Sequence, residues 1–464
     1  MTRRTAPASG APGSRSAFSA LFLARRLREL AGPVRGMRLC VAFSGGLDST
    51  ALLCACAALR ARYRCHVRAI HINHHLQPAA GSMARSARRA ARSLKVPCHV
   101  INAPVRAGRG ESVEAAARTH RYDALRRDLQ SGEWLLLAHH QEDQAESLLL
   151  QLLRGAGIAG LAAMPARSGV TLRPLLHVPR ARLFDYLRAR RTQWSEDPSN
   201  ADERFDRNFL RRRILPLLRE RWPGLEAAVS RTAGLAAEAQ ELLMLRAASQ
   251  LAGAQDGVAL SVSVIRRLSD ADRRNALRYW LGLRGLGMPD ARRLREIAGP
   301  MLEARHDALP QVRWPGGVLR RHGDLLYAAR PETGSEAGRA SKPVSWNWRR
   351  APRVELPGGG SLELIEDPNG ELRSASLPAR LTVAFRRADG SVAGLPGGRT
   401  LKRALQEGPL PPWERARVPL IYAGRRLLAV GDWWRAPECS AAHGARTVKR
   451  CRLRWRTGES GVRI

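Results

Sequence analysis

Lysine, aromatic residues and long hydrophobic runs are all scarce in this chain of 464 residues. The longest run free of charged and turn-forming residues is Ala51 to Leu59, far short of the roughly 20 residues that cross a bilayer. This excludes a membrane-spanning helix and predicts no membrane partner. The seven cysteines form no C-x-x-C pair, which argues against a zinc ribbon or an iron–sulfur centre and favours reduced thiols in a cytoplasmic protein.

Acidic residues are also scarce: 78 Lys and Arg against 41 Asp and Glu leave a formal net charge of +37. Such an excess attracts polyanions and makes a nucleic acid the leading partner. Only four of the basic residues are lysines, which together with the many alanines indicates the codon bias of a GC-rich genome. Part of the positive charge therefore reflects drift and solubility rather than binding.

The first 35 residues form a basic tail and a leading helix. No acidic residue occurs before Glu29, and the Arg, Ser and Ala content resembles a transit peptide. Residues 18–30 are amphipathic, however, and predict a helix that runs directly into the first strand. We therefore expect a short disordered tail rather than a targeting segment.

Short apolar runs alternate with helical patterns over residues 36–222, which we expect to be the catalytic domain. Strands separated by helices imply parallel β-α-β units with helices on both faces. The sequence therefore predicts an α/β fold with a doubly wound parallel sheet. The expected strands are 39–43, 66–72, 98–101 and 134–138, and the expected helices are 47–60, 82–94, 112–129 and 141–153.

Helical patterns dominate the middle of the chain. A helical stretch over 184–221 ends at the turn Trp222-Pro223-Gly224, and further helices are expected at 225–251, 270–283 and 290–302. These predict a mainly helical domain over 223–330. Residues 331–380 are expected to be a linker, because hydrophobicity is low from Pro331 to Ser341. Residues 381–464 show short strands and one helix, which predicts a small α+β module.

The most informative segment lies between the first strand and the helix after it, and reads Ser44-Gly45-Gly46-Leu47-Asp48-Ser49. Two glycines permit positive φ, and the start of the helix offers unpaired amides and the positive end of a dipole. Asp48 could hold Mg²⁺ against phosphate oxygens. A Walker A loop is excluded, because its lysine is missing. We predict that this loop binds the phosphates of a nucleotide.

A second polar segment, residues 138–147, follows the fourth predicted strand. Because ligands of open α/β sheets bind outside the carboxyl ends of the strands, it should share a rim with the glycine loop. Asp143 and Glu146 are three residues apart on one helix face, where they can bind a cation or an ammonium group. The sequence is compatible with two roles for this segment, a metal site and a hydrogen-bonded helix N-cap.

Taken in order, these motifs resemble those of the bacterial tRNA(Ile)-lysidine synthase family, a branch of the PP-loop ATP pyrophosphatases. The similarity is collinear over residues 39–216. It includes the glycine loop, His71-Ile72-Asn73-His74-His75-Leu76, Glu114 to Arg118, His139 to Ser147, Leu153 to Leu161, Arg173-Pro174-Leu175-Leu176, Glu196 to Asn200, and Arg207-Asn208 with Arg211. Glu142 and Ser147 stand where the family usually has Asp and Thr, which keeps both functional groups.

The resemblance implies a ligase that uses ATP to adenylate C2 of the wobble cytidine in the CAU anticodon of an isoleucine tRNA. L-lysine is then joined there to form lysidine, with release of AMP and pyrophosphate, and codon reading changes from AUG to AUA. ATP as a substrate, Mg²⁺ and tRNA(Ile) are thus the implied ligands, and a homodimer stays open. The domain over 223–330 and the module over 381–464 would bind the tRNA.

Residue roles follow from the same resemblance. Ser44 to Ser49 would bind ATP, and Asp48 and Asp143 would act in catalysis and hold the metal. Glu146 would pair with the ammonium of lysine. That ammonium, with a reference pKa of about 10.4, must lose a proton before it attacks, and His140 is the candidate base. The alternative for His140 is an imidazole bonded to backbone at the end of a strand.

Two groups of arginines are expected to contact tRNA or the adenylate. Arg118, Arg207 and Arg211 match basic positions of the family motifs, although Arg118 could instead form a helical ion pair with Glu114. Near the C-terminus, charged and apolar residues alternate as in a strand with one buried face. Arg450, Arg452, Arg454 and Arg456 would line its other face, either against tRNA or in solvent.

Two other classes of protein compete with this interpretation. A 2-thiolase with the same loop generally needs paired cysteines, which this sequence does not offer. A non-catalytic RNA-binding protein would explain the charge but not the glycine loop together with Asp143 and Glu146.

Overall fold

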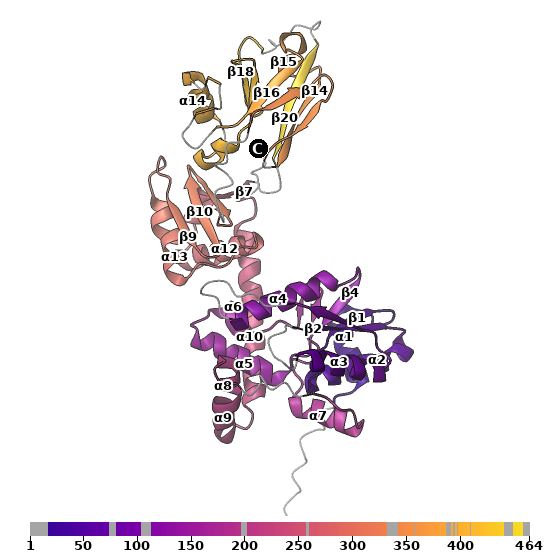
Figure 1. Ribbon diagram of the computed structural model, residues 1–464. Helices are drawn as coiled ribbons and strands as arrows, with labels where there is room; N and C mark the ends of the chain where they lie inside the picture. Colours follow the sequence, from indigo (N-terminus) through magenta and orange to yellow (C-terminus); the bar gives the residue numbers. More distant parts are fainter. Residues whose placement is uncertain are drawn as a thin grey trace, which may run out of the picture. The chain divides into compact units, whose positions relative to one another are not determined.

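The structure is a computed structural model. It describes residues 17–73, 80–103, 113–195, 202–256, 259–331, 342–357, 359–386, 391–392, 395–396, 398–408, 410–439 and 449–457. The chain divides into two compact units, residues 1–242 and 243–464, and each is described by itself (Figure 1). The predicted disordered tail and the motif at 196–200 lie outside the described residues.

The first unit is built around a sheet with the strand order β3-β2-β1-β4-β6-β5. Strands β1, β2, β3, β4 and β6 run parallel to one another, and β5 pairs antiparallel with β6. The four predicted strands are confirmed to within two residues. The bounds are β1 (Arg38–Ala42), β2 (His66–Asn73), β3 (Cys98–Asn102), β4 (Glu133–Leu136), β5 (Arg167–Ser168) and β6 (Thr171–Leu172).

Helices cover both faces of this sheet. Successive side chains of a strand point to opposite faces, so neighbouring residues of one strand pack in two different cores. Leu39 and Val41 of β1 face a core shared with helices α1, α2, α3 and α7, whereas Cys40 packs in a separate cluster with Leu125 of α4. This confirms the doubly wound α/β domain. The bounds are α1 (Ala20–Ala31), α2 (Leu47–Tyr63), α3 (Ala80–Ser93), α4 (Val113–Asp128), α5 (Gln141–Leu153) and α7 (Arg180–Ala189).

The helical stretch expected over 184–221 is interrupted. Helix α7 ends at Ala189, the chain passes through Arg191 at a φ of 52°, and the next described helix begins at Asp206. A π-helical turn (Leu210–Ile214) joins two of the later helices. The remaining helices of this region are α6 (Ile158–Leu161), α8 (Asp206–Phe209), α9 (Leu215–Arg221) and α10 (Leu225–Gln250), the last of which continues into the second unit.

In the second unit, the expected helices are present, and a five-stranded antiparallel sheet with the order β7-β8-β11-β10-β9 accompanies them. Trp280 and Leu277 of α12 pack against Leu319 and Leu326 of the sheet. The bounds are α11 (Val262–Arg266), α12 (Asp270–Leu283), α13 (Ala291–Glu296), a π-helical turn (Ile297–Met301), β7 (Gln255–Asp256), β8 (Ala259–Ser261), β9 (Gln311–Trp314), β10 (Gly317–His322) and β11 (Leu325–Ala329).

Two antiparallel sheets make up the rest of the second unit, and they correct the expected linker over 331–380. Trp346, Leu362 and Leu364, all within that range, are buried in the core. The first sheet is β12 (Val344–Asn347), β16 (Arg380–Ala384), β17 (Leu420–Ala423), β18 (Arg426–Val430) and β19 (Trp434–Arg435), and the second is β13 (Arg353–Glu355), β14 (Gly360–Glu366), β20 (Arg450–Thr457) and β15 (Leu372–Arg373). Short helical elements are Ser374–Ser376, α14 (Gly398–Glu407) and Pro412–Arg417.

Across the described ranges, every helix is too short or too polar to cross a membrane.

A largely buried ion-pair network ties strands β2 and β4 to the end of α4, at the amino-terminal edge of the parallel sheet. Arg68 Nη1 lies 2.7 Å from Asp128 Oδ2, and Arg68 Nη2 lies 2.6 Å from Glu133 Oε2. Glu133 is buried, and its hydrogen bond from Arg68 lowers the pKa of its carboxyl group. The arginine therefore neutralises two carboxylates from different elements.

We expect Arg68→Ala to lower the free energy of unfolding by about 3 kcal/mol, because removing one partner of a buried ion pair leaves the others uncompensated. Urea unfolding at neutral pH measures the change, and Arg92→Ala, an exposed arginine on α3, is the control. The lowered pKa of Glu133 stabilises the protein above the ordinary pKa of a glutamate, and this contribution is lost as the pH falls through the lowered value. The difference in the free energy of unfolding between the variant and wild type should therefore become smaller at acidic pH. Equal stability of the two proteins at neutral pH would contradict the assignment.

Candidate active site

The glycine loop folds into a turn between β1 and α2 that its own hydroxyl groups hold in place. Gly45 has a φ of 87°, a conformation that favours glycine, and Gly46 is the N-cap of α2. The Gly46 amide donates to Ser44 Oγ at 3.2 Å, and Ser49 Oγ donates to the Gly46 carbonyl at 3.1 Å. The amino-terminal end of a 17-residue helix therefore lies at the base of a shaped loop, as phosphate binding requires.

The two polar segments predicted to share a rim meet at His140, the N-cap of α5. Its ring is only 2% exposed, and Nε2 lies 3.6 Å from Asp48 Oδ2 and 3.4 Å from Asp143 Oδ2. The other ring nitrogen, Nδ1, lies 3.0 Å from Glu142 Oε2. Carboxylates from the glycine loop and from the first turn of α5 therefore surround one imidazole.

The protonation of His140 differs from what a general base requires. Burial by itself lowers the pKa of His140, but the charges of Asp143, Asp48 and Glu142 outweigh it and raise the pKa to about 10. At neutral pH the ring is thus an imidazolium, which has no free lone pair to accept a proton. His140 also forms a capping box with Asp143 at the start of α5, in which its backbone amide donates to Asp143 Oδ2 at 3.0 Å.

Asp143 and Glu146 are clamped by two arginines from a later part of the chain. Glu146 is fully buried and accepts hydrogen bonds from Arg207 Nε at 2.6 Å and from Arg211 Nε at 2.5 Å. Asp143 Oδ1 accepts from Arg207 Nη2 at 3.0 Å and from Arg211 Nη2 at 3.1 Å. Burial raises the pKa of Asp143, but His140 and Arg207 hold it well below its ordinary range. Glu146 can meet a lysine ammonium only if one of these guanidinium groups moves.

One residue of the site was not identified in the sequence analysis. Arg180, the first residue of α7, donates from its backbone amide to both carboxylate oxygens of Glu142, at 3.0 and 3.1 Å. Its side-chain Nε donates to Asp48 Oδ1 at 3.3 Å, and the side chain is half exposed. An exposed pair of this kind contributes roughly 0–1 kcal/mol, whereas breaking a buried pair costs about 3–5 kcal/mol. Arg180 can therefore leave its carboxylate far more easily than Arg207 can.

The other predicted arginines do not join this cluster within the described contacts. Arg118 lies on α4, and its side chain is outside the described part of the chain. The four arginines of β20 belong to the second unit, where Cys451 and Leu453 are buried and Trp455 packs against the core, as the alternation predicted. In that strand, Arg452 Nε lies 3.1 Å from Asp367 Oδ2, and Arg456 Nη2 lies 3.3 Å from Glu363 Oε2.

The donor set fits the expected Mg²⁺. Asp48 and Asp143 each turn one carboxylate oxygen toward the same atom of His140. Mg²⁺ is usually bound through one or two carboxylates together with substrate phosphates. Within the described ranges, no cluster of three or more His, Cys, Asp or Glu forms a metal site by itself, so phosphates would have to complete the coordination.

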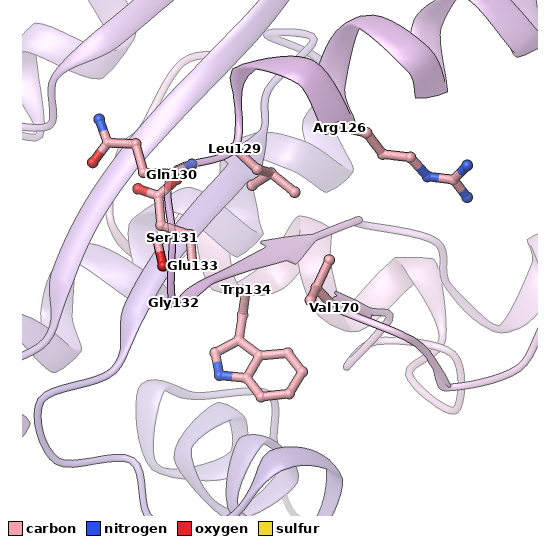
Figure 2. Close-up of a pocket in the computed structure, with 8 residues that line it drawn as sticks. All are labelled: Arg126, Leu129, Gln130, Ser131, Gly132, Glu133, Trp134 and Val170. Atoms are coloured by element: carbon pink, nitrogen blue, oxygen red, sulfur yellow. Dashed lines mark hydrogen bonds between the residues drawn. The ribbon is translucent and has the colours of Figure 1, made fainter. Parts of the chain in front are cut away.

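A cavity of about 540 Å³ is found elsewhere in the same unit, around the turn that leads from α4 into β4. Figure 2 shows Trp134 and Val170 on one side of this space and Arg126 and Leu129 on the other. The cavity lies at the amino end of β4, whereas His140 follows the carboxyl end of that strand. It is therefore not part of the candidate active site.

A glycine loop between a parallel strand and a helix, with acidic residues on the same rim, defines a nucleotide-binding domain of the PP-loop class. The PP-loop domain model matches residues 20–218. Two further models match beyond it: a TilS substrate binding domain at residues 260–327 and a TilS substrate C-terminal domain at residues 381–455.

Relatives that match over most of their length identify the family. The tRNA(Ile)-lysidine synthase of Alkalilimnicola ehrlichii is 43% identical over 432 residues, which are 92% of this chain and 96% of that protein. That of Methylococcus capsulatus is 40% identical over 87% of this chain and 93% of its own. The chain belongs to the tRNA(Ile)-lysidine synthase family. This confirms the resemblance drawn from the sequence and the prediction of an ATP-using, tRNA-modifying ligase.

A solved structure, the U34-tRNA thiolase NcsA from Methanococcus maripaludis, matches 46% of this chain and 76% of its own at 14% identity, with a TM-score of 0.40. That similarity is too low to carry a conclusion about function.

Proposed function

We propose that this chain joins L-lysine to C2 of the wobble cytidine in the CAU anticodon of tRNA(Ile), with ATP as the activating substrate and Mg²⁺ as the metal. AMP and pyrophosphate are the products, and the reaction takes place in the cytoplasm. The observation that carries the proposal is the meeting of Asp48 from the glycine loop with Asp143 from α5 at one buried imidazole, His140. This arrangement supports nucleotide chemistry at the rim of the sheet.

The first step activates the base. The C2 carbonyl of cytosine is a poor electrophile, so its oxygen attacks the α-phosphorus of ATP and the bond to the β-phosphate oxygen breaks. Amides at the start of α2 and the helix dipole would stabilise the phosphates. Asp48 and Asp143 would hold Mg²⁺, which when bound neutralises phosphate charge.

In the second step the amine of lysine attacks C2, and AMP leaves with the oxygen. The ammonium first has to lose a proton. His140 can accept it only when other cations engage Asp48 and Asp143, because the charges of these carboxylates are what raise its pKa.

The tRNA would be bound by residues 223–330 and by the module over 381–464, in addition to the catalytic domain. In that module the arginines of β20 alternate with residues that pack in the core, and Arg454 and Arg456 are exposed. Contacts from these arginines to phosphates would orient the tRNA without reading its sequence.

Incubating the protein with ATP and bulk tRNA, with and without lysine, tests the proposed function. We expect AMP release that depends on both tRNA and lysine. Turnover that requires a sulfur donor would instead indicate a thiolase, and tRNA binding without AMP release would indicate a binding protein. Either result would refute the proposal.

Asp48→Ala should abolish AMP formation while tRNA binding survives, because it removes a carboxylate at the phosphates but leaves the basic surface intact. Radiolabelled ATP turnover and a filter-binding assay measure the two properties. Asp185→Ala, an exposed aspartate on α7, is the matched control and should behave like wild type. Normal turnover in Asp48→Ala would overturn the assignment of this residue.

Glu146→Gln should raise the KM for lysine roughly tenfold, since it removes a negative charge that can attract an ammonium group. The KM is measured at saturating ATP and tRNA. If the KM for lysine is unchanged and only kcat and stability fall, then Glu146 serves to hold Arg207 and Arg211 and does not contact lysine.

Replacing the four β20 arginines (Arg450, Arg452, Arg454 and Arg456) by Ser should weaken tRNA binding and flatten its salt dependence, while ATP affinity stays unchanged. A matched control removes the same charge from exposed arginines elsewhere in the second unit: Arg350, Arg380, Arg399 and Arg425. Equal losses in the two variants, or no loss in the first, would mean that the β20 face is only solvated.

A further inference from the structure

Arg180 differs from the other two arginines that contact the carboxylates of the site. Its side chain is 50% exposed, and its partner Asp48 is 29% exposed. Arg207 and Arg211 instead share the fully buried Glu146 and the buried Asp143. Because a solvent-exposed ion pair is weak and a buried one is costly to break, Arg180 is the arginine that can change partner.

The backbone around Arg180 is fixed even though its side chain is not. Glu142 accepts two hydrogen bonds from the Arg180 amide and lies 3.0 Å from His140 Nδ1. A second tie joins the same segments, because the amide of Gln141 donates to the carbonyl of Val178 at 3.1 Å. The start of α7 is thus bonded to the start of α5, and this places the Arg180 guanidinium beside the glycine loop.

A metal ion that binds Asp48 competes with both of its present partners. Oδ1 accepts from Arg180, and Oδ2 faces His140. A cation that engages Asp48 would displace the weaker partner, and the released guanidinium would remain beside the loop. Guanidinium groups bind phosphate oxygens in a planar, two-pronged geometry.

We propose that Arg180 is a further ATP-binding residue: it pairs with Asp48 in the absence of nucleotide and transfers to a phosphate group of ATP when Asp48 takes up a cation. This rests on the proposed function, in which the glycine loop binds ATP. Arg207 and Arg211 remain with Asp143 and Glu146 during this exchange, and Glu142 serves as the positioning residue that sets the start of α7.

Calorimetric titration with α,β-methylene-ATP, which cannot be cleaved at the α-phosphate, tests this assignment in the presence of Mg²⁺. Arg180→Gln should weaken binding of the analogue roughly tenfold, through loss of a charged hydrogen bond. Arg188→Gln, an exposed arginine on the same helix, should not change it. The tRNA affinity of both variants should equal that of wild type.

The exchange of partners is tested without metal, in EDTA. Asp48→Asn removes the carboxylate that competes for Arg180, so it should strengthen binding of the analogue, and this gain should shrink when Arg180→Gln is also present. An equal gain in both backgrounds would overturn the exchange.

The possible failures are distinguishable. If wild type does not bind the analogue, the proposed function fails; if wild type binds and Arg180→Gln binds equally well, only the role of Arg180 fails. Glu142 bonds to the backbone amide, which every substitution keeps, and circular dichroism checks the fold. If Arg180→Gln does not fold, Arg180→Lys should bind the analogue several-fold more weakly than wild type, and unchanged affinity would refute the role.

Discussion

Charge balance at the carboxyl edge of the parallel sheet is the constraint on which the rest of the site depends. Carboxylates removed from water need cationic partners nearby, and here those partners come from segments far apart in the sequence. The glycine loop, the first turn of α5, the start of α7 and the helices after residue 205 are thereby held together. The carboxylates are Asp48, Glu142, Asp143 and Glu146, and the cations are His140, Arg180, Arg207 and Arg211.

Exposure to solvent distinguishes the ion pairs that hold the fold together from the ion pair that can take part in binding. At the amino edge of the same sheet, Arg68 closes a network with Glu133 and Asp128 that holds elements together. At the carboxyl edge, the Arg180–Asp48 pair is open to solvent and lies beside a loop shaped for phosphates. In our proposal, a triphosphate and its metal ion exchange partners with the open pair while the buried pairs keep the geometry.

Local patterns in the sequence predicted the strands β1 to β4, the glycine loop and the alternation along β20, because each depends on neighbouring residues. The sheets of the second unit were harder to predict, since strands such as Gln255–Asp256 and Arg353–Glu355 are too short to show a period. The linker expected over 331–380 failed because the low hydrophobicity of 331–341 was extended to a range that holds the seven-residue strand β14. The contact of Arg180 with Asp48 and the charge on His140 depend on residues brought together only by the fold, so no spacing in the sequence could indicate them.

The most direct test of the central claim is mass spectrometry of nucleosides from tRNA(Ile) after reaction with ATP and isotopically labelled lysine. The account predicts that one cytidine, at the wobble position, gains the mass of lysine less water and carries the label, and that omission of ATP abolishes the product. Absence of the lysine-modified nucleoside from the complete reaction, or a sulfur-containing nucleoside in its place, would contradict it.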